Sequence, residues 1–128
     1  MKRGSGIIIL DDKGRVLLQL REKKKELEFP DHWNLIGGSA NDGETPEEAL
    51  KREVEEELGI IIKGFSFFKK YIYEGMCEQY FFYAQLNLNP DEIKLTEGQK
   101  IAYFERNQLD SLKLAFNARR VINDFFDS

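Results

Sequence analysis

The chain has 128 residues, of which 41% are hydrophobic, 33% are charged and 12% are aromatic. These fractions are ordinary for a globular protein, so they exclude extended disorder, and the length suits a single domain over residues 1–128. The 19 basic and 23 acidic residues give a net charge of −4, which argues against a protein that holds the phosphate backbone of a nucleic-acid duplex.

Neither a membrane span nor a signal peptide is predicted. The aliphatic run 7–10 is far shorter than a span, and two aspartates follow it directly. The one cysteine, Cys77, has no partner for a disulfide or a zinc site. We therefore expect a soluble, cytoplasmic protein that does not act at a membrane.

The first third of the chain predicts strands and a loop. Two apolar runs, 6–10 and 15–20, flank a turn-forming segment (DDKG) and predict a β-hairpin. The charged segment 21–32 predicts a loop. A short apolar run follows at 33–36, and we expect the double glycine at 37–38 to end it.

The clearest helix lies in the middle of the chain. Thr45 is an expected N-cap, Pro46 suits the first turn, and Glu48 completes a capping box three residues after Thr45. Gly59 is the expected glycine just past the C-terminus of this helix.

The second half of the chain predicts another hairpin and two closing helices. The aromatic-rich runs 65–73 and 79–88 are strand candidates around a turn at 74–78. A polar loop is expected over 89–99, and a strand over 100–104.

Asn107 and Asn117 are the expected N-caps of two closing helices. Strands and helices mix without strict βαβ alternation, which favours an α/β fold with a mixed sheet and helices on its faces.

Three carboxylates gather on one face of the central helix. At 100° per residue, Glu53, Glu56 and Glu57 fall within an arc of roughly 100°, beside an apolar stripe at positions 50, 54 and 58. Like charges at such spacings destabilise an isolated helix by about a few tenths of a kcal/mol per pair. A bound hard cation such as Mg²⁺ would turn this destabilising cluster into a stabilising one, because it takes oxygen ligands. The alternative interpretation is an acidic helix face that is simply solvated.

The segment from Gly38 to Ile60 resembles the Nudix box, Gly-x5-Glu-x7-Arg-Glu-U-x-Glu-Glu-x-Gly-U, where U is aliphatic. Every specified position is filled: Gly38, Glu44, Arg52, Glu53, Val54, Glu56, Glu57, Gly59 and Ile60. The order of the surrounding elements is similar to that of a small MutT-like Nudix domain. One departure is Ile36, which stands where many members have proline before the double glycine.

This resemblance implies a Nudix fold, an α/β/α sandwich around a mixed β-sheet. It also implies Mg²⁺- or Mn²⁺-dependent hydrolysis of a nucleoside diphosphate linked to a group X, giving a nucleoside monophosphate and P–X. Arg52 is expected to orient Glu53, and Glu44 to support the loop or bind through water. The implied metal-binding residues are Gly38, Glu53, Glu56, Glu57 and Glu97, and the implied catalytic residues are Glu53, Arg52 and Glu97.

Residues outside the box are weaker candidates. Glu97 lies in a late loop where many family members present a further carboxylate, and either it or Glu53 is the expected general base. Arg21 is a candidate phosphate donor, with a solvated loop arginine as the alternative. Asn117 is a candidate for binding a purine edge, although its expected role as an N-cap already accounts for it. Several aromatic residues, Phe29, Trp33, Tyr71, Tyr73 and Tyr80, are candidates for stacking on a base or for the core.

Several functions compete within this assignment. The short chain, which starts directly on its first strand, favours an enzyme of nucleoside triphosphates over one of nucleotide sugars. Hydrolysis of dinucleoside polyphosphates is a further alternative. A non-catalytic Nudix-fold nucleotide sensor is the alternative from another class, and it is disfavoured because all the box carboxylates are present. The expected partner is a small nucleotide, and the sequence is compatible with a homodimer.

Overall fold

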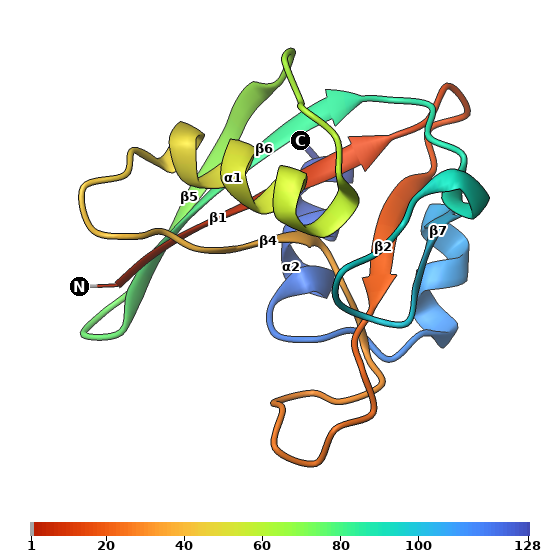
Figure 1. The fold of residues 1–128 in the computed structure, drawn as a ribbon, viewed down its shortest axis with the longest axis horizontal. Helices are drawn as coiled ribbons and strands as arrows, with labels where there is room; N and C mark the ends of the chain where they lie inside the picture. The colour runs from red at the N-terminus through yellow and green to blue at the C-terminus, as the bar shows by residue number, and fades with distance from the viewer. Residues whose placement is uncertain (1) are drawn as a thin grey trace.

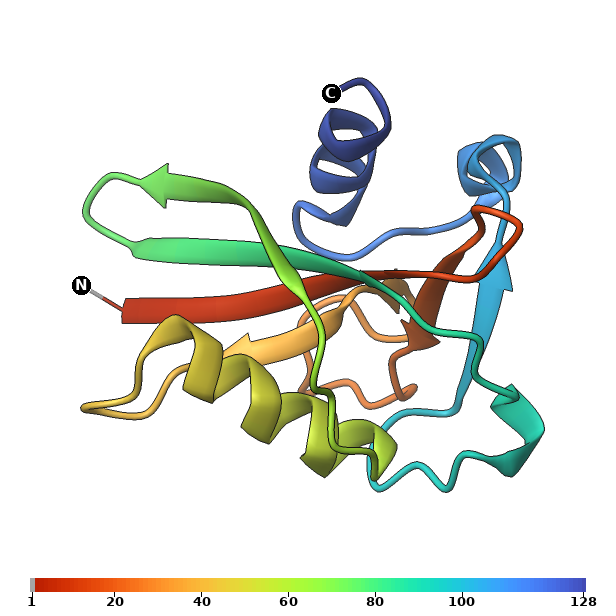
Figure 2. The same cartoon turned by 90° about the horizontal axis from the view of Figure 1, so that it is seen from above.

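The computed structural model describes residues 2–128 and shows a mixed β-sheet with one α-helix on each face (Figures 1 and 2). The strands are β1 (Lys2–Leu10), β2 (Val16–Leu20), β3 (Trp33–Asn34), β4 (Ile36–Ser39), β5 (Ser66–Tyr73), β6 (Cys77–Gln85) and β7 (Lys100–Phe104). The α-helices are α1 (Pro46–Leu58) and α2 (Ala118–Phe126), and two short 3₁₀ helices are η1 (Pro90–Glu92) and η2 (Arg106–Ser111).

Strand β1 is the centre of the sheet. It pairs in parallel with β6 along its whole length and antiparallel with β4. The predicted first hairpin is only partly formed, because β1 and β2 meet at the single pair Leu10↔Val16. Strand β2 pairs instead with β7 and β3. The predicted second hairpin is present as β5 and β6.

The alternation of side chains along β1 builds two cores. Ile7 and Ile9 face α1 and pack with its buried stripe, whereas Ile8 faces α2 and packs with Val121 and Ile122. Burial of a side chain of this size stabilises the fold by about 1.5–3 kcal/mol. This arrangement confirms the α/β/α sandwich around a mixed sheet.

Helix α1 has the caps that the sequence predicts. Thr45 accepts a hydrogen bond from the Glu48 N–H, the Glu48 carboxylate accepts one from the Thr45 N–H, and Gly59 adopts the left-handed conformation at the C-terminus. Leu50, Val54 and Leu58 form its buried stripe, as expected. Among the helices of residues 2–128, none is both long enough and apolar enough to cross a membrane.

Two local predictions are wrong. The double glycine does not end a strand, because Gly37 and Gly38 lie inside β4 and pair with Gly6 and Ser5 of β1. The helix expected after Asn107 is the 3₁₀ helix η2, and its N-cap is Glu105. Pairing with β1 overrides the local preference of the two glycines. The start of η2 is set by a capping box between Glu105 and Gln108.

Candidate active site

The carboxylates of α1 are organised by Arg52. Its guanidinium donates to Glu44 Oε2 at 2.8 Å, Glu53 Oε1 at 2.9 Å and Glu56 Oε2 at 3.1 Å, and to the Ser39 carbonyl at 2.8 Å. The predicted contact between Arg52 and Glu53 is therefore present. Hydrogen bonds from Arg52 also hold the pKa of Glu44 below its usual value, so this carboxylate stays ionised and supports the loop before α1.

The glycine at position 38 lets β4 approach α1 closely. A Cβ atom on Gly38 would lie 2.5 Å from Cδ of Glu53, so a larger residue would displace that carboxylate. The neighbouring Gly37 N–H donates to Glu57 Oε2 at 3.1 Å. Glu53 therefore lies against the bare backbone of Gly38, and Glu57 is held by the backbone N–H of Gly37.

Glu57 and Glu53 have perturbed acidities. Burial, followed by the charge of Glu53, raises the pKa of Glu57 to about 8. Burial also raises the pKa of Glu53, with the charges of Glu56 and Glu97 adding to the effect and Arg52 opposing it. Acidic groups that cannot all ionise together are typical of functional sites.

The loop that carries Glu97 is tied to its surroundings rather than held loosely. The Thr96 hydroxyl donates to the Glu56 carbonyl at 2.6 Å, and the buried Gln19 amide donates to the Glu97 carbonyl at 2.7 Å. The Glu97 side chain is exposed, and its charge acts on both Glu53 and Glu57. The structure thus brings Glu97 toward the helix carboxylates with a fixed backbone.

A cavity of about 400 Å³, here called the acidic cavity, opens beside these carboxylates. Its lining residues are Gln19, Arg21, Glu22, Lys24, Leu27, Glu57, Thr96, Glu97 and Gly98. It therefore combines oxygen ligands with two cationic side chains, a combination that suits phosphate groups accompanied by a metal ion.

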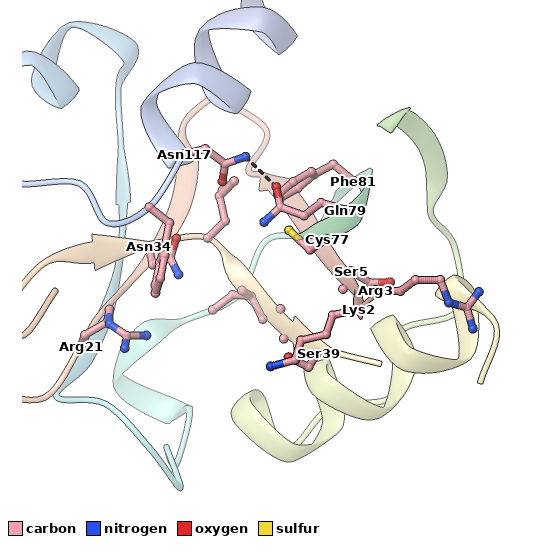
Figure 3. A pocket seen from close by; sticks show the side chains of 17 residues that line it. Lys2, Arg3, Ser5, Arg21, Asn34, Ser39, Cys77, Gln79, Phe81 and Asn117 are labelled. Atoms are coloured by element: carbon pink, nitrogen blue, oxygen red, sulfur yellow. Dashed lines mark hydrogen bonds between the residues drawn. The ribbon is translucent and has the colours of Figure 1, made fainter. Parts of the chain in front are cut away.

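A second cavity, of about 390 Å³, lies by β1, β4, β6 and the start of α2 (Figure 3). We call it the amide pocket, because three carboxamides line it. Its main side chains are Arg21, Asn34, Gln79, Phe81, Phe116 and Asn117. Aromatic rings beside a few polar groups are typical of a pocket for a flat organic ligand.

Arg21 belongs to both cavities. Its Nε donates to the Glu28 carbonyl at 3.1 Å, and its guanidinium lies 5.1 Å from the centre of the Phe116 ring. Arg21 is therefore placed at the junction of the two cavities, and its role in binding phosphate stays a prediction.

Asn117 precedes α2, but its side chain makes no capping hydrogen bond. Its Nδ2 group donates instead to Gln79 Oε1 at 2.6 Å and to Tyr73 Oη at 2.9 Å. Asn117 is therefore the N-cap residue by position, as predicted, but its side chain does not cap the helix. The side chain lines the amide pocket instead.

Sequence reasoning missed Phe116 as a candidate. Phe116 and Phe29 contact each other at 4.8 Å between ring centres, and both have positive φ angles, 50° and 51°. They are 48% and 39% exposed, so both rings reach solvent. Strained backbone that presents aromatic rings marks a candidate binding surface. No sequence motif signals it.

The carboxylate set has the chemistry for a hard divalent cation. In the part of the chain that the structure describes, no three His, Cys, Asp or Glu side chains converge on one ion position. Arg52 holds Glu53 and Glu56 instead, and Gly37 holds Glu57. Burial is the main cause of the raised pKa of Glu57, and the charges of Glu53, Glu97 and Glu56 add to it. These grouped carboxylate oxygens are the donor type that Mg²⁺ or Mn²⁺ takes, so the residues fit such an ion.

The comparisons with known proteins agree with this geometry. A sequence profile of the NUDIX domain matches residues 1–125. The chain belongs to the Nudix family. An uncharacterised Nudix hydrolase of Listeria monocytogenes is 35% identical over 131 residues, covering 85% of this chain and 77% of the relative. The 8-oxo-dGTP diphosphatase of Haemophilus influenzae is 34% identical over 110 residues, covering 81% of this chain and 76% of that relative.

The fold of this Nudix chain is also found in a solved MutT structure from work on Aliivibrio salmonicida and Vibrio cholerae. The two superpose with a TM-score of 0.78 over 96% of this chain and 94% of that one, at 20% identity. These matches confirm the family predicted from the box. The roles of the individual side chains stay predictions.

Proposed function

We propose that this Nudix protein is a divalent-metal-dependent pyrophosphohydrolase that cleaves a nucleoside diphosphate linked to X into a nucleoside monophosphate and P–X. Nucleoside triphosphates are the substrate class we favour. The observation that carries the proposal is the pair of cavities that share Arg21: one is lined by carboxylates and cations, the other by amides and aromatic rings. Such a pair suits the phosphate chain and the nucleoside of one molecule. The related diphosphatase that acts on 8-oxo-dGTP supports this substrate class.

A bound Mg²⁺ or Mn²⁺ would neutralise phosphate charge and acidify an attacking water. Glu53, Glu56, Glu57 and Glu97, with the backbone at Gly38, are the residues we expect to hold it. In the mechanism we propose, Glu53 accepts the proton of the attacking water, and a raised pKa brings this carboxylate closer to the operating pH of a general base.

The remaining residues position these groups. Arg52 fixes the Glu53 carboxylate through its hydrogen bond and would have to release Glu56 for metal binding. Arg21 donates to the phosphate chain at the junction of the cavities. We place the protein in the cytoplasm with a small nucleotide as its partner, and a homodimer stays a prediction.

The test is hydrolysis of a panel of nucleoside triphosphates, oxidised nucleotides, nucleotide sugars and dinucleoside polyphosphates, with the products identified. We expect a nucleoside monophosphate as one product, loss of turnover in excess chelator and its return with Mg²⁺ or Mn²⁺. Full activity in chelator contradicts the metal requirement. Release of only a nucleoside diphosphate and orthophosphate contradicts the cleavage position.

Metal binding is tested separately with Glu56→Gln and Glu57→Gln. Both variants should bind Mn²⁺ more weakly while keeping the fold, because each loses a charged oxygen ligand. Glu55→Gln is the matched control, since Glu55 is exposed on the same helix. If either variant binds Mn²⁺ as tightly as the wild type, the substituted glutamate is not a ligand of the metal.

A further inference from the structure

The amide pocket contains a hydrogen-bonded pair of carboxamides with a defined direction. Asn117 Nδ2 gives one hydrogen to Gln79 Oε1 at 2.6 Å (Figure 3). It gives the other to Tyr73 Oη at 2.9 Å. With both hydrogens used, Asn117 has only its carbonyl oxygen left for a ligand. Gln79, whose oxygen is occupied, has its amide hydrogens left. The pair therefore presents an acceptor beside a donor.

Tyr73 helps to fix this direction. Its hydroxyl oxygen accepts from Asn117 and lies 3.4 Å from a donating nitrogen of Arg120. Reversing the pair would require both amides to turn together and the Tyr73 hydroxyl to become a donor to Asn117. The Arg120 contact favours Tyr73 as an acceptor, so it favours the direction observed.

The position of the pair indicates what it contacts. Gln79 and Asn117 line the same pocket as the rings of Phe81 and Phe116, which suits a flat ring with polar atoms on its edge. Adenine has a donor at position six and an acceptor at position one of the purine ring, whereas hypoxanthine has an acceptor at position six and a donor at position one. Cytosine and uracil differ in the same way at positions four and three. An amide pair of fixed direction therefore matches one member of each couple better than the other.

We infer that Gln79 and Tyr73 determine base specificity, with Gln79 contacting the base edge and Tyr73 orienting Asn117. The pair then distinguishes amino from oxo bases. This inference rests on the proposed function, because it takes the ligand of the pocket to be the nucleoside part of the substrate.

The experiment measures kcat and KM for ATP against ITP and for CTP against UTP, in the wild type and in Tyr73→Phe and Gln79→Met. We expect the wild type to favour one member of a couple about tenfold or more in kcat/KM. Both variants should reduce that ratio to about threefold or less, through KM for the preferred nucleotide and with kcat unchanged.

Tyr80→Phe is the matched control. Tyr80 is on the same strand as Gln79, but it packs with the core on the α1 side of the sheet, and its hydroxyl contacts Glu78. This variant should keep the wild-type ratios, whereas a general loosening of the strand would change them as well.

Three outcomes overturn the inference. Equal use of both members of each couple by the wild type contradicts it, as do wild-type ratios in both folded variants. If the wild type cleaves no nucleotide at all, the proposed function fails and the inference fails with it. The first two outcomes leave the proposed function intact.

Discussion

The carboxylate face of α1 and the amide pocket meet at β4, but they are built in different ways. Residues 52–57 form most of the first region in one continuous segment, held by a single guanidinium. The second combines the end of β2, the middle of β6 and the residues before α2. The expected chemistry therefore depends on one helix, and the expected recognition depends on contacts between distant segments. We therefore expect substitutions of pocket side chains to change recognition without disturbing the carboxylates.

The largest effect should come from the carboxylate region. Glu53→Gln is expected to lower kcat by about 10²- to 10⁴-fold if Glu53 is the general base. Glu97→Gln should have a smaller effect, because Glu97 lies on an exposed loop. Both values of kcat are measured at saturating metal. If Glu97→Gln has no activity while Glu53→Gln keeps a nearly wild-type kcat, the general base is on the loop, and the helix carboxylates only bind metal.

A second substitution tests the close approach of β4 to α1. Gly38→Ala places a methyl group 2.5 Å from the Glu53 carboxyl carbon, so the carboxylate must move. We expect kcat to fall by about 10- to 10²-fold, since small misplacements of a reacting group have effects of this size. Gly64→Ala is the control, because a Cβ at Gly64 meets nothing within 4 Å. Equal kcat values for the two variants would show that activity does not depend on the close contact between the Gly38 backbone and the Glu53 carboxylate.

In the amide pocket, changes should affect binding rather than turnover. Phe116→Ala removes a ring that lines the pocket and stacks with Arg21, and we expect KM to rise by about 3- to 10-fold while kcat changes little. Phe67→Ala removes an exposed ring on β5 that lies outside the pocket, so it is the control. A fall in kcat with unchanged KM would place Phe116 in the chemistry instead.

The smallest effect concerns the stability of the metal-free protein. The pKa of Glu57 is raised to about 8 in the folded state, so its stabilising contribution is complete below its ordinary value of 4.5 and is lost as the pH rises through 8. Glu57→Gln resembles the protonated form, and it should make the free energy of unfolding less dependent on pH in this range. Denaturant unfolding of both proteins between pH 4.5 and 9, in chelator, measures the difference. Parallel curves would contradict the raised pKa.

The sequence predicted α1 well because the determining interactions are local. The capping box, the terminal glycine and the buried stripe all arise within one turn or at helical spacing. Arg52 also reaches Glu53 and Glu56 from within the same helix. Local interactions of this kind leave a signature in consecutive residues.

The first hairpin and Asn117 show that local sequence does not predict which distant residues pair. A turn between two apolar runs predicts that they pair with each other, but β1 pairs mainly with β4 and β6, and β2 mainly with β7. Likewise, Asn117 occupies the N-cap position of α2 as predicted, but its side chain donates to the Tyr73 hydroxyl and the Gln79 amide oxygen instead of capping the helix.

By itself, the sequence determined the family, the mixed α/β architecture and the helix that carries the carboxylates, because each depends on local spacing or on side-chain alternation. Only the tertiary structure decided that Gly38 would contact Glu53, that Arg21 would join two cavities, and that Phe116, Gln79 and Asn117 would share one pocket. These contacts join residues from separate elements of the chain, and they form only when the strands pair and the helical segments pack on the sheet.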